Sequence, residues 1–158
     1  MKTFRDYFNR LPKDIQKLYI CAQRIKHHPE IWVYTHTRMV FEQVLKLYGN
    51  DVNLLVAALF HDIAKKDCKR VYHKNGIVKT SHIGHEKRAI GYINMFIHLF
   101  DDLNIDADLI TSVVENHMRA HQYTDGTLKK ISKRKAFEDL RYFDDIIKFS
   151  KCDMGGRL

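Results

Sequence analysis

Seven consecutive apolar residues, LLVAALF at 54–60, lead directly into His61 and Asp62, and Lys65 follows three positions later. Because no polar side chain interrupts this run, it predicts a helix that is buried on every side and extends over residues 52–64. Neighbouring side chains on a helix point about 100° apart, so His61 and Asp62 reach one ion only where both can turn inward. The pair therefore becomes a metal site only if distant parts of the chain supply further ligands.

The composition favours a single compact domain. The chain has 158 residues, of which 45% are hydrophobic, and its two prolines and seven glycines form no linker. Lysine and arginine together number 27 against 19 aspartate and glutamate residues, which gives a net charge of +8. Such a basic balance is typical of chains with an anionic partner, such as phosphate or nucleic acid, and equally of a well solvated surface.

The three cysteines, Cys21, Cys68 and Cys152, lie far apart and form no CxxC motif. This pattern is typical of free thiols in a reducing compartment. The first ten residues are too polar for the apolar region of a signal peptide, and no segment approaches the ~18 consecutive apolar residues of a membrane span. We therefore expect a cytoplasmic protein with no membrane partner.

Helical periodicity covers most of the chain. Helices are predicted over residues 12–26, 30–48, 52–64, 84–100, 106–118, 132–142 and 144–153. One region differs: two short segments flank Asn75-Gly76, a pair favoured in tight turns, so a β-hairpin is predicted there. Its basic side chains fit either a lid over a substrate or an ordinary surface loop. The expected fold is all-α with a short hairpin near 69–80, and residues 1–28 form a helical extension packed on a domain at 29–158.

Residue types that bind metals recur on the apolar faces or at the ends of these helices. His36 and His117 fall on apolar faces, where a lone histidine is more often a hydrogen-bonded core residue than a ligand; His121 is expected in a loop. The complete candidate set is His36, His61, Asp62, His85, His117 and Asp153. Imidazole and carboxylate groups suit divalent ions from manganese to zinc, and a set without cysteine argues against a closed structural zinc site.

Five motifs carry a resemblance to a known family: VYTHT (33–37), HD (61–62), GHE (84–86), ENH (115–117) and CDMGGR (152–157). Their order resembles the signature of HD-domain metal-dependent phosphohydrolases. The GHE and ENH motifs resemble the extra histidine motifs of members that hold two metals. The first and last motifs are most similar to the HD domain that follows the catalytic head of some bacterial tRNA nucleotidyltransferases. The resemblance covers about 29–157 and implies an HD-domain helical bundle.

The resemblance also implies roles for individual residues. The first metal would be held by His36, His61, Asp62 and Asp153. Asp62 would then bridge to a second metal, which His85 and His117 hold. The cofactor would be one or two divalent transition metals (manganese, iron, cobalt, nickel or zinc), with magnesium as a further option.

Lys65 matches the lysine of the HDxxK variant of the family signature and would contact a substrate phosphate, so that Asp62 and Lys65 are the expected catalytic residues. Three arginines are further candidates for phosphate contact: Arg88, Arg119 and Arg157. Arg88 and Arg119 would each more often be an ordinary surface residue.

The resemblance implies a phosphohydrolase, either a phosphodiesterase or a phosphatase, that acts on nucleotides, cyclic nucleotides or RNA ends through a metal-activated water. The chain has neither the length nor the Gly-Ser and paired-aspartate motifs of a nucleotidyltransferase head, so addition of nucleotides to tRNA is not expected. One alternative is an HD-type two-iron oxygenase, which shares the HDxxK pattern. A second is a non-catalytic RNA- or protein-binding HD module. The expected partner is a phosphate-containing small molecule or an RNA end.

Overall fold

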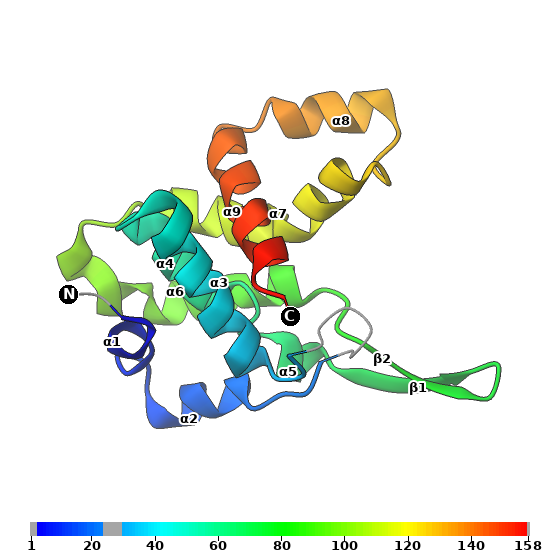
Figure 1. Ribbon diagram of the computed structural model, residues 1–158, viewed down its shortest axis with the longest axis horizontal. Helices are drawn as coiled ribbons and strands as arrows, with labels where there is room; N and C mark the ends of the chain where they lie inside the picture. Colours follow the sequence, from blue (N-terminus) through cyan, green and yellow to red (C-terminus); the bar gives the residue numbers. More distant parts are fainter. Residues whose placement is uncertain (1–2, 24–29, 158) are drawn as a thin grey trace.

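The computed structural model describes residues 3–23 and 30–157, which form a bundle of helices and one β-hairpin (Figure 1). In chain order the elements are α1 (Phe4–Phe8), α2 (Lys13–Gln16), the 3-10 helix η1 (Lys17–Tyr19), α3 (Val33–Tyr48), α4 (Val52–Phe60), α5 (Lys65–Cys68), β1 (Arg70–Lys74), β2 (Ile77–Ser81), α6 (His85–Phe96), the 3-10 helix η2 (Ile97–Leu103), α7 (Ala107–Asp125), α8 (Ile131–Glu138) and α9 (Phe143–Gly155). The predicted helical fold with a hairpin is confirmed for the described residues.

Helix α4 is the central element of the bundle. All of its side chains from Leu54 to Phe60 are fully buried, and the helix packs against α1, α3, α6, α7 and α9. Asp51 begins it as the N-cap, because its carboxylate accepts a hydrogen bond from the Leu54 N–H at 3.1 Å. Burial of each leucine or phenylalanine side chain contributes about 1.5–3 kcal/mol. The apolar run is therefore the helix on which the surrounding helices assemble.

Helix α4 ends at Phe60, so the prediction that it continues to residue 64 is wrong. Beyond this point the chain tightens into a turn, in which the Ile63 N–H donates to the Phe60 carbonyl. The last carbonyls of a helix lack intrahelical donors. One of them, the Ala58 carbonyl, accepts instead from Nδ1 of His61 at 2.7 Å. The end of the helix thus orients the imidazole ring that follows it.

The next carbonyl, that of Leu59, accepts a hydrogen bond from the buried Tyr19 hydroxyl at 2.6 Å. Since this contact holds Tyr19 at the end of η1, the chain leaves its helical path there. The predicted helix over 12–26 is therefore wrong beyond Tyr19, and Ala22 instead forms an antiparallel bridge with Trp32. Residues 24–26 of that prediction lie outside the described residues.

Helix α1 has no counterpart among the predicted helices. Thr3 and Asp6 form a capping box in which each side chain accepts from the backbone N–H of the other. The T-x-x-D pattern at residues 3–6 was the available signal. Phe4, Tyr7 and Phe8 of this helix are buried in the same hydrophobic core as α3 and α4. The division of the chain at residue 28 stays a prediction.

The predicted hairpin is present, and within the described residues strands β1 and β2 pair only with each other. Asn75 and Gly76 connect them with positive φ angles of 54° and 74°. Positive φ at both central residues is what a type I′ turn requires, and asparagine and glycine adopt it readily. The hairpin projects away from the helical bundle (Figure 1).

Helix α7 continues to Asp125, so the prediction of a loop after residue 118 is wrong. Its last turns are held by tertiary contacts, because the Tyr123 ring packs against Phe137 and Phe143. The predicted helix over 132–142 is α8, which begins at residue 131 and ends at 138, and the last predicted helix is α9. The longer α7 brings His121 into a helix.

None of the helices in the described part of the chain combines the length and apolar character that a membrane crossing requires. Cys21, Cys68 and Cys152 are free thiols, as the sequence analysis expected.

Two buried tyrosines provide a test of how α4 ends. Tyr19→Phe leaves the buried Leu59 carbonyl without its donor, so we expect a loss of about 1–3 kcal/mol in the free energy of unfolding. Tyr7→Phe is the matched control, because the Tyr7 hydroxyl is buried and has no hydrogen-bond partner among the described residues. This control should be neutral or stabilising. Urea denaturation followed by circular dichroism measures both, and equal losses would contradict the role of Tyr19.

Candidate metal centre

The structure brings all six predicted ligand side chains together at the middle of the bundle. They come from α3, the turn after α4, the first turn of α6, the middle of α7 and the last turns of α9. All are buried: His36, His61, Asp62, His85, His117 and Asp153. The helices that carry them pack directly on one another, since α3 contacts α9 and α7 contacts α4, α6 and α9. Their role as ligands stays a prediction.

The first group of donor atoms surrounds one oxygen of Asp62. Nε2 of His61 lies 3.2 Å from Asp62 Oδ2, and Nε2 of His36 lies 3.6 Å from the same oxygen. Asp153 closes the group, because its Oδ1 lies 2.8 Å from His36 Nε2 and 3.5 Å from His61 Nε2. Four side chains from two helices and one turn thus converge on a single point.

The second group surrounds the other oxygen of Asp62. Nε2 of His85 lies 3.1 Å from Asp62 Oδ1, and Nε2 of His117 lies 3.6 Å from it. The two imidazole nitrogens are 3.2 Å apart. The two oxygens of one carboxylate therefore face different pairs of histidines, which is the arrangement of a carboxylate that could bridge two ions. In each group three ligand atoms lie within 4.8 Å of one another.

Backbone carbonyls select the tautomer of these four histidines. A carbonyl only accepts, so a ring nitrogen beside one must carry the proton and donate it. The Nδ1 atoms lie beside such carbonyls: His36 with Gly156 (2.9 Å), His61 with Ala58 (2.7 Å), His85 with His82 (2.9 Å) and His117 with Val114 (2.5 Å). In the neutral rings the Nε2 lone pairs therefore all point into the cluster, as metal-binding histidines require.

The cluster fits a bound cation. The lone pairs of His85 and His117 face each other beside a carboxylate oxygen, and they repel unless positive charge lies between them. Within the described part of the chain, Asp62 Oδ2 is contacted by the Lys65 ammonium, whereas the buried His61 Nε2 has no hydrogen-bond donor. Buried polar atoms are rarely left in this condition without a water or ion. The residues present could thus hold divalent metal at both groups.

Electrostatics in the cluster favour positive charge at its centre. Burial acts to lower the pKa of His61, but the Asp62 and Asp153 carboxylates outweigh it and raise this pKa to about 10. Burial likewise acts to raise the pKa of Asp62, yet His61 and Lys65 hold it well below its usual range. Burial lowers the pKa of His117. A divalent ion would replace protons that otherwise balance the two carboxylates.

Lys65 lies at the edge of the cluster and is buried. Its ammonium is 2.9 Å from Asp62 Oδ2 and donates to Gln23 Oε1 at 2.5 Å. The three predicted arginines are placed differently. Arg88 is mostly exposed and its Nε lies 3.6 Å from Asp67 Oδ2, so the structure does not bring it into the cluster.

Arg119 is exposed on α7. Arg157 directly follows Gly156, whose carbonyl accepts from His36, so it lies beside the cluster. Its buried Nε has no hydrogen-bond partner among the described residues. Of the three arginines, Arg157 is therefore the one whose position suits contact with a bound anion.

Three residues outside the predicted set of ligands contact the cluster. His121, expected in a loop, lies on α7, and its Nε2 is 2.5 Å from Asp153 Oδ2. Its spacing of four from His117 was the signal, since such residues share a helix face. Glu30 lies 2.9 Å from His36 Nδ1, and Gln23 contacts Lys65. No motif in the sequence singled out these two residues.

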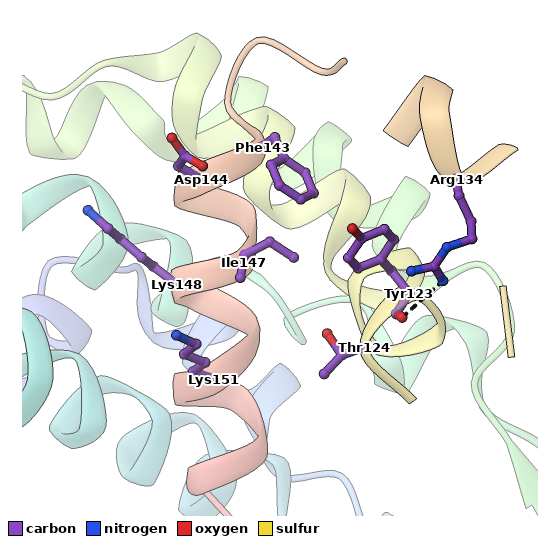
Figure 2. Close-up of a pocket in the computed structure, with 8 residues that line it drawn as sticks. All are labelled: Tyr123, Thr124, Arg134, Phe143, Asp144, Ile147, Lys148 and Lys151. Atoms are coloured by element: carbon purple, nitrogen blue, oxygen red, sulfur yellow. Dashed lines mark hydrogen bonds between the residues drawn. The ribbon is translucent and has the colours of Figure 1, made fainter. Parts of the chain in front are cut away.

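A separate pocket of about 630 Å³ lies between α7, α8 and α9. It is lined by Tyr123, Thr124, Arg134, Phe143, Asp144, Ile147, Lys148 and Lys151 (Figure 2). The Arg134 guanidinium lies 4.2 Å from the centre of the Tyr123 ring and also donates to the Tyr123 carbonyl. Arg134 therefore helps to hold the pocket wall. The pocket shares no lining residue with the metal-binding candidates.

Comparison with known proteins identifies one group of relatives. The chain is 29% identical over 148 residues to a multifunctional CCA protein of Thioalkalivibrio sulfidiphilus, covering 91% of this chain and 34% of the relative. It is 32% identical over 123 residues to a multifunctional CCA protein of Methylococcus capsulatus, covering 77% of this chain and 27% of the relative. A third, from Polaromonas naphthalenivorans, is 27% identical over 149 residues, covering 92% and 34%.

The chain spans about a third of the length of these curated relatives. No family model matches the chain, and no solved structure matches it. The chain is therefore similar to one region of the multifunctional CCA proteins, and its assignment as an HD domain stays a prediction.

The shared position of Asp62 leads to a prediction about metal content. We expect wild-type protein, equilibrated with Mn²⁺, Co²⁺ or Zn²⁺ and dialysed, to retain two ions per chain by elemental analysis. Asp62→Ala should lose both, because each oxygen of this carboxylate faces one group. His85→Ala should lose only one. The matched control is His98→Ala, an exposed histidine on η2 that should keep wild-type content. Unchanged metal content in Asp62→Ala would rule out the site.

Proposed function

We propose that the chain is a metal-dependent phosphohydrolase that cleaves phosphate esters of nucleotides, cyclic nucleotides or RNA ends. The observation that carries this proposal is the Asp62 carboxylate, buried between two pairs of histidines whose Nε2 atoms point toward it. A set made only of imidazole and carboxylate groups leaves coordination positions for water and substrate. Such open positions distinguish a catalytic from a closed structural metal site.

His36, His61, Asp62 and Asp153 would hold the first ion, and Asp62 would share the second with His85 and His117. When bound, the metals supply activation of a water molecule near neutral pH and neutralisation of charge on phosphate oxygens. The chain itself contributes fixed orientation, because backbone carbonyls hold the histidine rings before any ligand arrives. Preorganised groups need no rearrangement during the reaction.

Lys65 supplies a buried positive charge beside the cluster. Its ammonium rests against Asp62 and Gln23. Metal bound at Asp62 would neutralise this carboxylate, and the ammonium would then be available to a substrate phosphate oxygen. Charge stabilisation of this kind is strong in a buried site, where the effective dielectric constant is low. We assign Asp62 and Lys65 as the catalytic residues on this basis.

Two findings support a nucleotide or RNA-end substrate. The chain carries a net charge of +8, which favours binding of polyanions. It is also similar to a region of the multifunctional CCA proteins over most of its length. The relatives are named as CCA proteins. As part of the proposal, we assign this chain a substrate connected with CCA as well.

The first test compares hydrolysis by the wild-type chain with hydrolysis by variants that lack His61 or Asp62. His61→Ala and Asp62→Ala should lower turnover by about a thousandfold or more, because the metal and its charge stabilisation are lost, while circular dichroism stays helical. The screen compares a chromogenic phosphodiester, 2′,3′-cyclic nucleotides, and nucleotide mono- and triphosphates, each with several metals and with chelator. His98→Ala serves as the control.

The screen is run without oxygen. Anaerobic hydrolysis excludes an oxygenase reaction for that substrate, whereas oxygen consumption by an iron-loaded protein without hydrolysis would favour the two-iron alternative. Wild-type turnover in both the His61 and Asp62 variants would refute the site.

Neighbouring lysines provide a second test. Lys65→Ala should lower kcat by about a hundredfold through loss of charge stabilisation, whereas Lys66→Ala, which removes an exposed lysine, should change it less than twofold. Steady-state kinetics on the same diester measure both. Equal effects in the two variants would show that Lys65 has no special role.

A further inference from the structure

The β-hairpin is the most exposed regular element of the described chain. Every residue of β1 is exposed, and so is the first part of β2. An isolated two-stranded hairpin is marginally stable in water, so an extended one with exposed apolar side chains suggests a partner. Residues 69–82 contain four lysines and arginines and no aspartate or glutamate. The exposed surface is therefore strongly basic.

The strand register sorts these side chains onto two faces. Side chains alternate along a strand, and directly paired residues share a face. Tyr72 pairs with Lys79, and Lys74 pairs with Ile77. One side of the hairpin, here called the basic hairpin face, therefore carries Arg70, Tyr72, Lys74 and Lys79. The other side carries Val71, His73, Val78 and Thr80.

The base of the hairpin is attached to the candidate metal centre at both ends. Strand β1 follows the short helix that begins with Lys65, whose ammonium contacts Asp62. After β2, Nδ1 of His82 donates to the Lys65 carbonyl at 3.0 Å, and the His82 carbonyl accepts from His85 at 2.9 Å. The base of the hairpin therefore lies beside the cluster.

We propose that the basic hairpin face binds single-stranded RNA and presents its end to the metal centre. Positive side chains around an aromatic ring are the means by which proteins hold single strands, through phosphate contacts and base stacking. Five-residue strands extend about 17 Å, enough for a few nucleotides. A second copy of the chain is a poor occupant, because this face and the chain as a whole are both positively charged. The delivery of an end to the site rests on the proposed function, whereas the binding does not.

The experiment measures binding of a fluorescein-labelled single-stranded RNA of about 12 nucleotides to the full chain by anisotropy, over a range of salt concentrations and in chelator so that nothing is hydrolysed. In Lys74→Ala/Lys79→Ala the affinity should fall at least tenfold. The slope of log affinity against log salt should become shallower by about 1.4, since each lost phosphate contact on a single strand contributes about 0.7. Tyr72→Ala should weaken binding about tenfold at unchanged slope.

Two controls match these variants. Lys13→Ala/Lys17→Ala removes the same charge from an exposed surface near the N-terminus, and His73→Ala alters the opposite face of the hairpin. Both should bind within twofold of wild type. Lys74→Arg/Lys79→Arg should restore affinity, which separates lost charge from a misfolded hairpin.

Wild-type affinity in the Lys74/Lys79 variant, or an equal loss in the Lys13/Lys17 control, would overturn the proposal. So would a wild-type chain that binds vesicles of phosphatidylserine but not RNA, because this result would assign the face to a lipid surface. RNA binding that depends on the hairpin in a chain without hydrolytic activity would support this inference and refute the proposed function.

Discussion

The bundle depends on how it accommodates one buried carboxylate, that of Asp62. Taking a carboxylate out of water costs several kcal/mol, and the cost is offset only when partners surround it. Here His36 and His61 face one oxygen, and His85 faces the other. His36 and His85 come from helices that are distant in sequence, so both helices must be in place before the charge is balanced. The packing of the core and the assembly of the candidate site therefore depend on the same helices.

Helix ends and nearby backbone carbonyls fix the orientation of imidazole rings in this cluster. Where α4 stops, its unsatisfied Ala58 carbonyl turns the ring of His61, and the Tyr19 hydroxyl satisfies the next carbonyl. His117 is oriented in a similar way within α7, because its Nδ1 donates to the carbonyl of Val114, three residues earlier. In both cases a nearby backbone carbonyl selects the tautomer of a histidine. The ring orientations of His61 and His117 thus follow from short-range structure, whereas His36 is oriented by the Gly156 carbonyl, which is distant in sequence.

Local and periodic features of the sequence were predictable, whereas contacts made at long range were not. The run of 54–60 predicted a buried helix, and Asn75-Gly76 predicted the hairpin, since both patterns act over a few residues. The helix over 12–26 failed because Tyr19 is held by a carbonyl of α4, 40 positions away. His121 was misplaced for a similar reason, as aromatic packing of Tyr123 extends α7. The six candidate ligands were found by residue type and order, but which carboxylate oxygen each faces required coordinates.

The depth of the cluster has a consequence for selectivity. Its candidate ligands are almost fully buried, so under the proposed function they would contact only the reacting phosphate and the few atoms around it. Phosphates of nucleotides and RNA ends look alike at that range, and any discrimination between them has to come from surfaces outside the core. The segment between Asp62 and His85 is suited to this task, because it leaves the cluster, forms the exposed basic hairpin and returns to the cluster. An element inserted between two candidate ligands can change in sequence without disturbing the helices that hold them, so selectivity and chemistry can be altered independently.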